Sequence, residues 1–451
     1  MTTELITAVE PSTAAGDTRS ALRFITCGSV DDGKSTLIGR LLVDSKSVLQ
    51  DHLAGVTRQG ETDLAQLTDG LAAEREQGIT IDVAYRYFST EARKFIIGDA
   101  PGHEQYTRNM VTAASQADAA VVLVDATKLQ WQDPDLALLA QTRRHALLLS
   151  LLRVPSIVFA INKLDAVDEP AQAFTNIRGA LEVFTRDAGI QASGILPISA
   201  LKGWNVATAG EQPAGWAGYE GPALLDILEQ LPVTPRETDL PLAFPVQWVE
   251  KFSSSNDTSQ GRRVFWGRVA TGTLASGAQV TLLPGGQTAT VAQVLDHARG
   301  ARSIAAGLSA GVILDRELDV SRGDWIVAAP QVAADAAEFD EPPAAVWPAT
   351  RELSTTIAWL DDEPLVAGRV YWALHGHRWV KAKVRKVLER LDIHTLKGEE
   401  ATQLEPNAIG HVELALQEAI PATPFKRSRA LGSLILVDTA SHKTAGAVLV
   451  R

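Results

Sequence analysis

Cysteine and long apolar runs are scarce in this chain. One cysteine among 451 residues excludes an intramolecular disulfide, as is usual in a reducing cytoplasm. No apolar run approaches the roughly 18–20 residues that a membrane-spanning helix needs. Residues 1–20 lack the basic start and apolar core of a secretory signal, and we interpret them as a flexible tail. These absences predict a cytoplasmic protein with no membrane partner.

Positive charge is also in short supply. The 42 Lys and Arg residues are outnumbered by 54 Asp and Glu residues, which gives a formal net charge of −12. A surface devoted to nucleic acid usually needs clustered basic side chains, so the balance predicts no nucleic-acid partner. The length suits about three domains, each with a core of its own.

What the chain does have is a phosphate-binding loop. Residues 28–35 have the sequence GSVDDGKS and match the pattern G-x-x-x-x-G-K-[ST]. Gly28 and Gly33 allow the tight turn in which backbone N–H groups surround phosphate oxygens. Lys34 adds a positive charge at the β- and γ-phosphates, and Ser35 offers a hydroxyl to Mg²⁺. An apolar strand-like run precedes the loop and a helix-like run follows it, so the phosphates are expected at a helix N-terminus.

Three further motifs identify the nucleotide as GTP. The segment FIIGDAPGH ends at residue 103, INKLD spans residues 161–165, and ILPISALKG contains Ser199 and Ala200. The Asp165 carboxylate can accept hydrogen bonds from guanine N1–H and the 2-amino group, each contributing roughly 1.5–3 kcal/mol. A backbone N–H near Ala200 can reach guanine O6. Each motif is short, but the motifs occur in the order expected of a GTPase, and each lies at the end of an apolar run. This combination predicts a GTP-hydrolysing α/β domain over residues 21–236.

Further residues around the γ-phosphate are candidates for the chemistry of hydrolysis. Thr80 lies where GTPases supply a second hydroxyl to Mg²⁺ from a loop that orders around the γ-phosphate. Gly102 can donate a backbone N–H to that phosphate, and Asp99 can hold Mg²⁺ through water. His103 could orient the attacking water, and the alternative is a surface or capping histidine.

The predicted catalytic residues are thus Lys34, Thr80 and His103, and the predicted Mg²⁺ ligands are Ser35 and Thr80, with Asp99 acting through water. The residues expected to bind GTP are Gly28, Ser29, Val30, Asp31, Asp32, Gly33, Lys34, Ser35, Thr36, Asp99, Ala100, Pro101, Gly102, His103, Asn162, Lys163, Leu164, Asp165, Ser199, Ala200 and Leu201.

The rest of the chain has the short alternating runs of antiparallel strands. We expect a small β-barrel over residues 240–330, an acidic Ala/Pro-rich linker over residues 331–347, and a second β domain over residues 348–451. The basic segment 377–386 alternates apolar and charged residues, which favours a strand with one buried face over a binding patch. The His375-Gly376-His377 segment has the wrong spacing for an adenylyl-transfer motif.

The motifs together resemble the translational GTPases. GSVDDGKST at 28–36, EQGITIDVAYRYF at 76–88 and DAPGHEQYTRNMVTAAS at 99–115 look like the large, GTP-binding subunit of bacterial sulfate adenylyltransferase (ATP sulfurylase). Asp32 stands where elongation factors typically carry His. The resemblance implies an elongation factor Tu-like architecture, with an α/β P-loop GTPase domain followed by two antiparallel β-barrels.

The resemblance also implies a function. The family couples GTP hydrolysis to formation of adenosine 5′-phosphosulfate and pyrophosphate from ATP and sulfate, which bind a smaller catalytic subunit in a heterodimer or larger assembly. No second phosphate-binding loop follows Leu201, so no fused adenylyl-sulfate kinase is expected. The alternatives are an elongation factor delivering aminoacyl-tRNA and a free-standing switch. Asp32, the GITIDVAYRYF segment and the acidic balance disfavour the former.

Two features admit more than one interpretation. Residues 129–140, LQWQDPDLALLA, look longer than the family pattern. They are either a partner-contact loop or a neutral surface insertion, and we favour the second. Cys27 at the mouth of the phosphate-binding loop is better explained as a small core residue than as a nucleophile.

Overall fold

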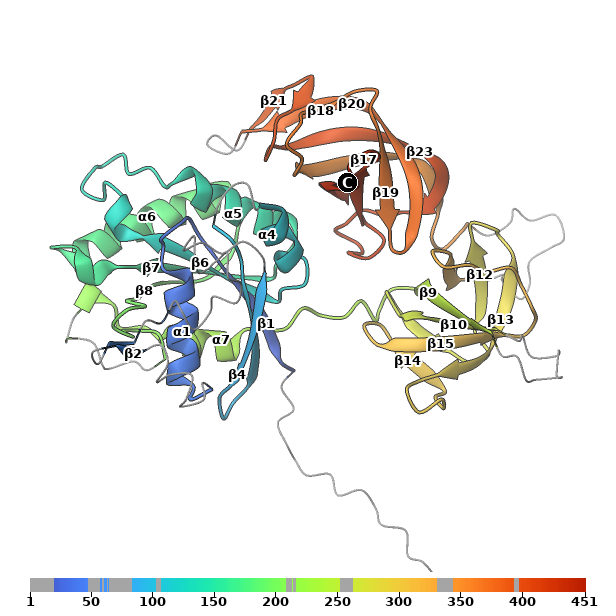
Figure 1. The fold of residues 1–451 in the computed structure, drawn as a ribbon, viewed down its shortest axis with the longest axis horizontal. Coiled ribbons are helices and arrows are strands. Elements are labelled where there is room, and N and C mark those ends of the chain that lie inside the picture. The colour runs from blue at the N-terminus through green and yellow to red at the C-terminus, as the bar shows by residue number, and fades with distance from the viewer. Residues whose placement is uncertain are drawn as a thin grey trace, which may run out of the picture. The chain divides into compact units, whose positions relative to one another are not determined.

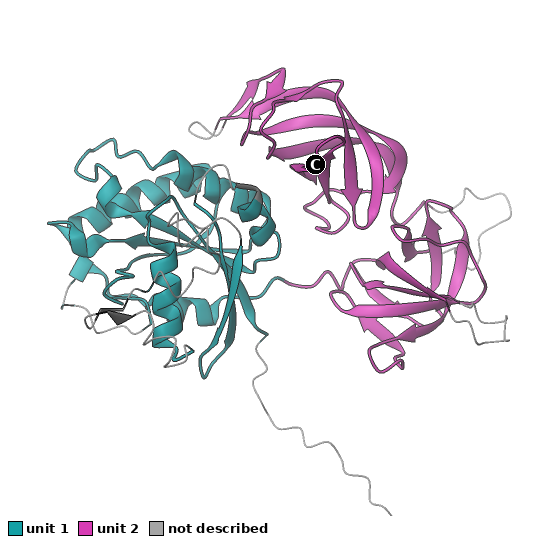
Figure 2. Ribbon diagram, viewed as in Figure 1, with its two compact units in different colours: residues 1–234 teal, residues 235–451 magenta. Residues whose placement is uncertain are grey.

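The structure of the chain is a computed structural model. It describes residues 20–47, 57–58, 61–62, 64, 83–102, 107–207, 213, 216–251, 263–330, 344–392 and 397–451. The chain divides into two compact units, which meet in the sequence between Thr234 and Pro235 (Figure 2). Among the described residues, no helix combines the length and apolarity needed to cross a membrane.

The N-terminal unit is a layered α/β fold (Figure 1). Its strands are β1 (Leu22–Cys27), β2 (Thr57–Arg58), β3 (Glu61–Thr62), β4 (Ala84–Ser89), β5 (Lys94–Asp99), β6 (Ala119–Asp125), β7 (Ser156–Asn162) and β8 (Ala192–Pro197). Its α-helices are α1 (Lys34–Asp44), α4 (Thr107–Ala114), α5 (Ala140–Leu151), α6 (Pro170–Asp187) and α7 (Leu224–Gln230), and its 3₁₀ turns are η3 (Ala126–Lys128), η4 (Leu164–Ala166) and η5 (Trp216–Gly218).

Six strands form the main sheet in the order β4-β5-β1-β6-β7-β8. β4 runs antiparallel to β5, and the other neighbours pair in parallel. Every residue of β6 and β7 is buried, as expected for strands covered on both faces. Parallel order places the carboxyl ends of β1, β5, β6 and β7 at one edge of the sheet, where ligands bind in such folds.

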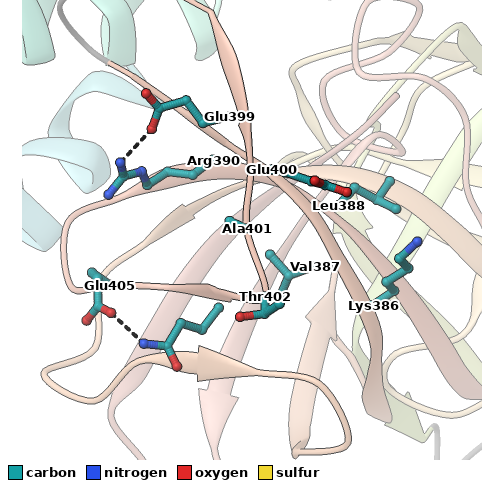
Figure 3. A pocket seen from close by; sticks show the side chains of 10 residues that line it. Lys386, Val387, Leu388, Arg390, Glu399, Glu400, Ala401, Thr402 and Glu405 are labelled. Atoms are coloured by element: carbon teal, nitrogen blue, oxygen red, sulfur yellow. Dashed lines mark hydrogen bonds and ion pairs between the residues drawn. The ribbon is translucent and has the colours of Figure 1, made fainter.

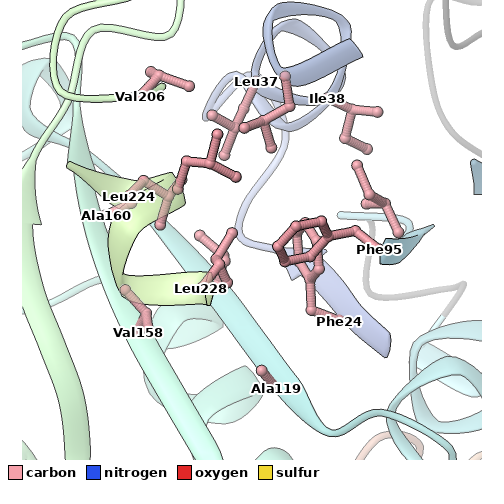
Figure 4. Packing of buried hydrophobic residues seen from close by; sticks show 14 of the residues in the cluster. Phe24, Leu37, Ile38, Phe95, Ala119, Val158, Ala160, Val206, Leu224 and Leu228 are labelled. Atoms are coloured by element: carbon pink, nitrogen blue, oxygen red, sulfur yellow. The ribbon is translucent and has the colours of Figure 1, made fainter. Parts of the chain in front are cut away.

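The core beneath α1 and α7 fixes the strand that carries the phosphate-binding loop. Leu37 and Ile38 of α1 and Leu228 of α7 are fully buried and belong to the same cluster as Phe24 and Phe95 (Figure 4). Phe24 meets Phe95 edge-on, with ring centroids 6.2 Å apart. Burying side chains of this size contributes roughly 1.5–3 kcal/mol each, so the start of α1 is firmly held against the sheet.

The C-terminal unit begins with a closed six-stranded barrel, whose strands follow the order β10-β15-β13-β12-β16-β9. Its elements are β9 (Ala243–Lys251), β10 (Arg263–Arg268), β11 (Thr273–Ala275), β12 (Gln279–Leu283), β13 (Thr288–Leu295), β14 (Ser303–Ala305), β15 (Ser309–Leu314) and β16 (Trp325–Ala328). β11 and β14 form a separate two-stranded ribbon.

A second antiparallel sheet follows in the order β19-β24-β25-β17-β23-β20-β21. Because β19 also pairs with β20, the first six strands of this order close into a ring. Its elements are β17 (Ala349–Trp359), β18 (Leu365–Val366), β19 (Val370–His375), β20 (Arg378–Leu391), β21 (Gly398–Glu400), β22 (Gln403–Leu404), β23 (Ile409–Pro421), β24 (Ser433–Asp438) and β25 (Thr444–Val450). The fold class expected from the sequence is therefore confirmed.

The two rings are joined within their unit by buried and charged contacts. The Trp325 and His375 rings lie 5.1 Å apart. The Glu237 carboxylate accepts hydrogen bonds from the Ser428 hydroxyl at 2.6 Å and the Arg429 backbone N–H at 2.8 Å. These contacts fix one ring against the other.

Candidate functional site

The predicted nucleotide motifs meet at the carboxyl edge of the N-terminal sheet. Gly28 follows β1, Asp99 ends β5, and Asn162 ends β7. Thr26 of β1 lies beside Asp99 in the strand register. Segments far apart in the sequence thus form one site.

The phosphate-binding loop has the backbone that its glycines permit. Gly33 has φ of +94° immediately before α1, in the region that favours glycine. A Cβ atom on Gly33 would lie 2.4 Å from Asn162 Nδ2, and one on Gly102 would lie 2.5 Å from Lys34 Nζ. Both positions therefore require glycine for close approach. The loop leads into the N-terminus of α1, where free N–H groups and the helix dipole attract anions.

Lys34 is the cation nearest to the loop's interior. It is 7% exposed, and its ammonium donates to Ser29 O at 2.7 Å and Gly28 O at 3.3 Å. Burial lowers its pKa, an effect that the charges of Asp99 and Asp32 oppose. A desolvated ammonium interacts more strongly with phosphate than one in water, because the local dielectric is lower.

Oxygen atoms suited to a hard cation gather beside Lys34. Ser35 Oγ lies 3.5 Å from Asp99 Oδ2, and Thr26 Oγ1 lies 3.4 Å from Asp99 Oδ1. Asp99 is 4% exposed. A hydroxyl and a carboxylate are the donor types with which Mg²⁺ is held in nucleotide sites, so these residues fit the ion.

Asn162 and Asp165 occupy different environments. The Asn162 amide is buried, donates to Asp32 O at 2.8 Å and accepts from the Ala200 N–H at 3.0 Å. It therefore joins three loops. Asp165 is half-buried on η4, and its carboxylate makes no hydrogen bond to another described residue. Its acceptor capacity is free for a ligand.

The loop around Ala200 is held from α1. Arg40 donates from Nη2 to Leu201 O at 2.6 Å and from Nε to Ala200 O at 3.4 Å. β8 ends at Pro197, before Ser199 and Ala200, which end the apolar run in the sequence. The reason is that Ser199 pairs with Trp204 in a turn instead of continuing the sheet.

The remaining predicted residues occupy the same loops. Lys163 reaches Asp31 O at 2.5 Å, and Leu164 is fully buried in η4. Val30 lies in the phosphate-binding loop, and Thr36 lies in the first turn of α1. Ala100 and Pro101 directly follow β5. Leu201 lies at the surface, with 62% of its side chain exposed. Thr80 and His103 lie outside the described residues.

Sequence reasoning predicted Lys163 but missed Lys128, and it missed that Asp125 anchors both lysines. Lys163 lies 2.7 Å and Lys128 3.8 Å from Asp125 Oδ2, at the end of β6. Lys128 also contacts Asp32 Oδ1 at 2.9 Å. The signal in the sequence was Asp32 itself, since an acid inside a phosphate-binding loop needs a cation beside it.

Two residues of α5 were also missed as neighbours of the site. Gln141 donates from Nε2 to Gly102 O at 3.3 Å and lies 2.8 Å from His145 Nε2. Burial and the Lys34 charge lower the pKa of His145 to about 3, so the ring is neutral and Nε2 can accept that hydrogen bond. α5 therefore braces the loop that carries Gly102.

Two other features lie apart from these motifs. Segment 129–140 is anchored by buried Leu129, Trp131 and Leu138, and Asn176 of α6 donates to Trp131 O at 2.8 Å. In the second ring, a hollow of 520 Å³ is lined by Lys386, Val387, Leu388, Arg390, Glu399, Glu400, Ala401, Thr402, Gln403 and Glu405 (Figure 3). Among its lining residues, Arg390 and Glu399 pair at 2.6 Å, and the Gln403 amide donates to Glu405 at 2.6 Å.

Comparison with known proteins agrees with this geometry. Residues 19–234 match the elongation factor Tu GTP binding domain, and residues 352–451 match the GTP-eEF1A C-terminal domain-like family. The first match supports GTP binding by the N-terminal unit. A solved structure of sup35 complexed with GDP covers 98% of this chain and 96% of its own, at 22% identity and a TM-score of 0.40.

Relatives match over nearly the whole chain. Sulfate adenylyltransferase subunit 1 of Laribacter hongkongensis is 40% identical over 97% of this chain and 86% of its own length, and that of Vibrio atlanticus is 41% identical over 96% and 86%. The bifunctional enzyme CysN/CysC of Xylella fastidiosa is 43% identical over 94% of this chain. The chain spans 65% of that longer relative.

Proposed function

The chain belongs to the family of sulfate adenylyltransferase subunit 1, and from this membership we propose that it hydrolyses GTP to drive sulfate activation. The reaction driven is the formation of adenosine 5′-phosphosulfate and pyrophosphate from ATP and sulfate. That exchange is unfavourable, because the sulfate–phosphate anhydride is a high-energy bond. ATP and sulfate bind a smaller catalytic subunit, and GTP binds this chain.

One observation carries the proposal: the motifs of a guanine-nucleotide site meet at one edge of the sheet in a member of this family. The N–H groups that lead into α1 bind the phosphates, and Lys34 stabilises charge on the transferring phosphoryl group. Asp165 accepts from the guanine N1–H and 2-amino groups. Asn162 positions the loops that contain Asp165 and Ala200 against the phosphate-binding loop.

Ser35 and Thr80 would hold Mg²⁺, with Asp99 acting through water. When bound, Mg²⁺ neutralises negative charge on the phosphoryl oxygens. Thr26 and Ser35 already hold the Asp99 carboxylate by hydrogen bonds, so its orientation is set within the sheet edge. His103 positions the attacking water, and Gly102 donates its N–H to the γ-phosphate.

The loops that carry Thr80 and Gly102 are the elements that respond to the γ-phosphate. Their response makes GTP hydrolysis conditional on the partner's reaction, which is what coupling requires. The elongation-factor alternative explains the GTP site but not the near full-length match to subunit 1 relatives.

The experiment combines coupling with nucleotide specificity. The chain is purified with its candidate small subunit, and GTP turnover is measured with and without ATP plus sulfate, alongside the yield of adenylyl sulfate. We expect each reaction to depend on the other. The proposal would be overturned if GTP turnover did not depend on ATP and sulfate and the yield of adenylyl sulfate did not depend on GTP.

The variant Asp165→Asn tests whether the nucleotide bound by this chain drives the reaction. An amide can donate to the 2-oxo group of xanthine, so the variant should prefer XTP to GTP by at least about tenfold, the loss of one charge-assisted hydrogen bond. Adenylyl sulfate formation should then follow XTP in the variant and GTP in the wild-type chain. An unchanged preference for GTP would show that Asp165 does not contact the base.

A further inference from the structure

Asp32 is a buried acid inside the loop that must bind a polyanion. Its side chain is fully buried, and Oδ2 accepts from the Ser29 N–H at 2.6 Å. Its backbone carbonyl accepts from the Asn162 amide at 2.8 Å. A carboxylate here is poorly solvated and repels phosphate oxygens, so on its own it would weaken the site.

Lys128 forms an ion pair with the Asp32 carboxylate. Its ammonium contacts Asp32 Oδ1 at 2.9 Å and donates to the Val30 carbonyl. Lys128 is held in turn at the end of β6, where Asp125 lies 3.8 Å from it. Lys128 thus fixes both the carboxylate and the backbone of the phosphate-binding loop from η3, which directly follows β6, the neighbour of β1 in the sheet.

We propose that Lys128 is a positioning residue for guanine-nucleotide binding, which cancels the charge of Asp32 and holds the phosphate-binding loop in its binding conformation. The inference rests on the proposed function only in taking the ligand to be a guanine nucleotide. Lys128 acts through its contacts with Asp32 and the Val30 carbonyl, and in this role it sets the affinity and release rate of the nucleotide.

The other charged groups near Asp32 do not replace Lys128. Lys34 of α1 is the second cation that acts on Asp32, but it is committed to the phosphates. Lys163 of the η4 loop bonds Asp31 O and Asp125. The Cys27 thiol of β1 is neutral, because burial raises its pKa to about 12.

The test uses the full-length chain and a fluorescent GDP analogue, with five variants. Lys128→Met should raise the Kd for GDP and speed its release by at least about tenfold, because it leaves a buried charge unpaired. Adding Asp32→Asn to Lys128→Met removes that charge and should restore the Kd to within about threefold of Asp32→Asn alone. Lys128→Arg keeps the cation and should bind GDP nearly as the wild type does. Lys94→Met, at an exposed lysine of β5, is the matched control.

A pH series separates charge from packing. Burial raises the pKa of Asp32 and Lys128 opposes that rise, so in Lys128→Met the carboxyl should become neutral more readily and GDP affinity should recover as the pH is lowered. The double variant should lack this recovery. The pH dependence of its GDP affinity therefore gives the correction for titration of GDP itself. A double variant as weak as Lys128→Met, or a Lys128→Met with normal affinity, would overturn the proposal. A wild-type chain that does not bind GDP would instead overturn the proposed function.

Discussion

At the scale of single residues, chemistry is predictable from sequence, but contacts between distant segments are not. The motif alone predicts that Asp165 accepts hydrogen bonds from guanine, and in the structure its carboxylate makes no hydrogen bond to another described residue. Asn162 was predicted within the same site, yet its bond to the Asp32 carbonyl links residues 130 positions apart. The Lys128 partner of Asp32 was missed for the same reason: a buried acid requires a cation, but the sequence does not say which one.

Gly33 provides a residue-scale prediction. Alanine at Gly33 combines φ of +94° with a Cβ atom 2.4 Å from Asn162 Nδ2, so the loop must shift. We expect Gly33→Ala to lower GDP affinity by at least about tenfold, equivalent to ~1.4 kcal/mol. The matched control is Gly189→Ala, where φ is +65° and no atom lies within 4 Å of the new Cβ. It should cost about 1 kcal/mol of stability and leave affinity unchanged. Equal affinities in titration calorimetry would contradict the prediction.

At the scale of elements, alternation predicts strands better than it predicts their partners. In β20, Val380, Ala382 and Val384 are buried and the basic residues between them are exposed, as the pattern predicts. The sequence does not show that β20 pairs with β19 through a turn at Gly376, where φ is +58°. Nor does it show that His375, the last residue of β19, is buried against Trp325, because that contact joins two rings.

His375 gives a prediction for this junction. Burial lowers its pKa from 6.5 to about 4, and Nε2 lies 3.2 Å from Leu431 O. Between these pH values the unfolded chain takes up a proton that the folded chain does not, so the free energy of unfolding falls as the pH falls. The full effect is about 3 kcal/mol.

His375→Gln keeps a donor for Leu431 O but cannot titrate. Its urea midpoint, followed by tryptophan fluorescence, should therefore lose less between about pH 7 and about pH 5 than the wild-type midpoint does. The other histidines are common to both proteins, so their contribution cancels in this difference. Parallel pH profiles would contradict the prediction, even if the variant were less stable at every pH.

At the scale of the whole molecule, each unit has its own hydrophobic core. The N-terminal core joins α1 and α7 to the sheet, and separate clusters fill the rings of the C-terminal unit. The change from helix-like to alternating patterns along the chain makes this division predictable. The nucleotide motifs all lie in the N-terminal unit, so ligand binding should stabilise that unit first.

GDP should accordingly stabilise the folded chain in proportion to its free concentration. A ligand that binds only the folded state adds about 2.7 kcal/mol at 100 times its Kd, and each further tenfold rise adds about 1.4 kcal/mol. Calorimetric scans at increasing GDP should show the unfolding transition of the N-terminal unit moving to higher temperature. ADP should have little effect, since adenine lacks the donors that Asp165 accepts, and Gly33→Ala should shift the response to higher GDP concentrations. Equal stabilisation by ADP and GDP would mean that phosphate contacts alone determine binding, and that the loop around Asp165 does not select the base.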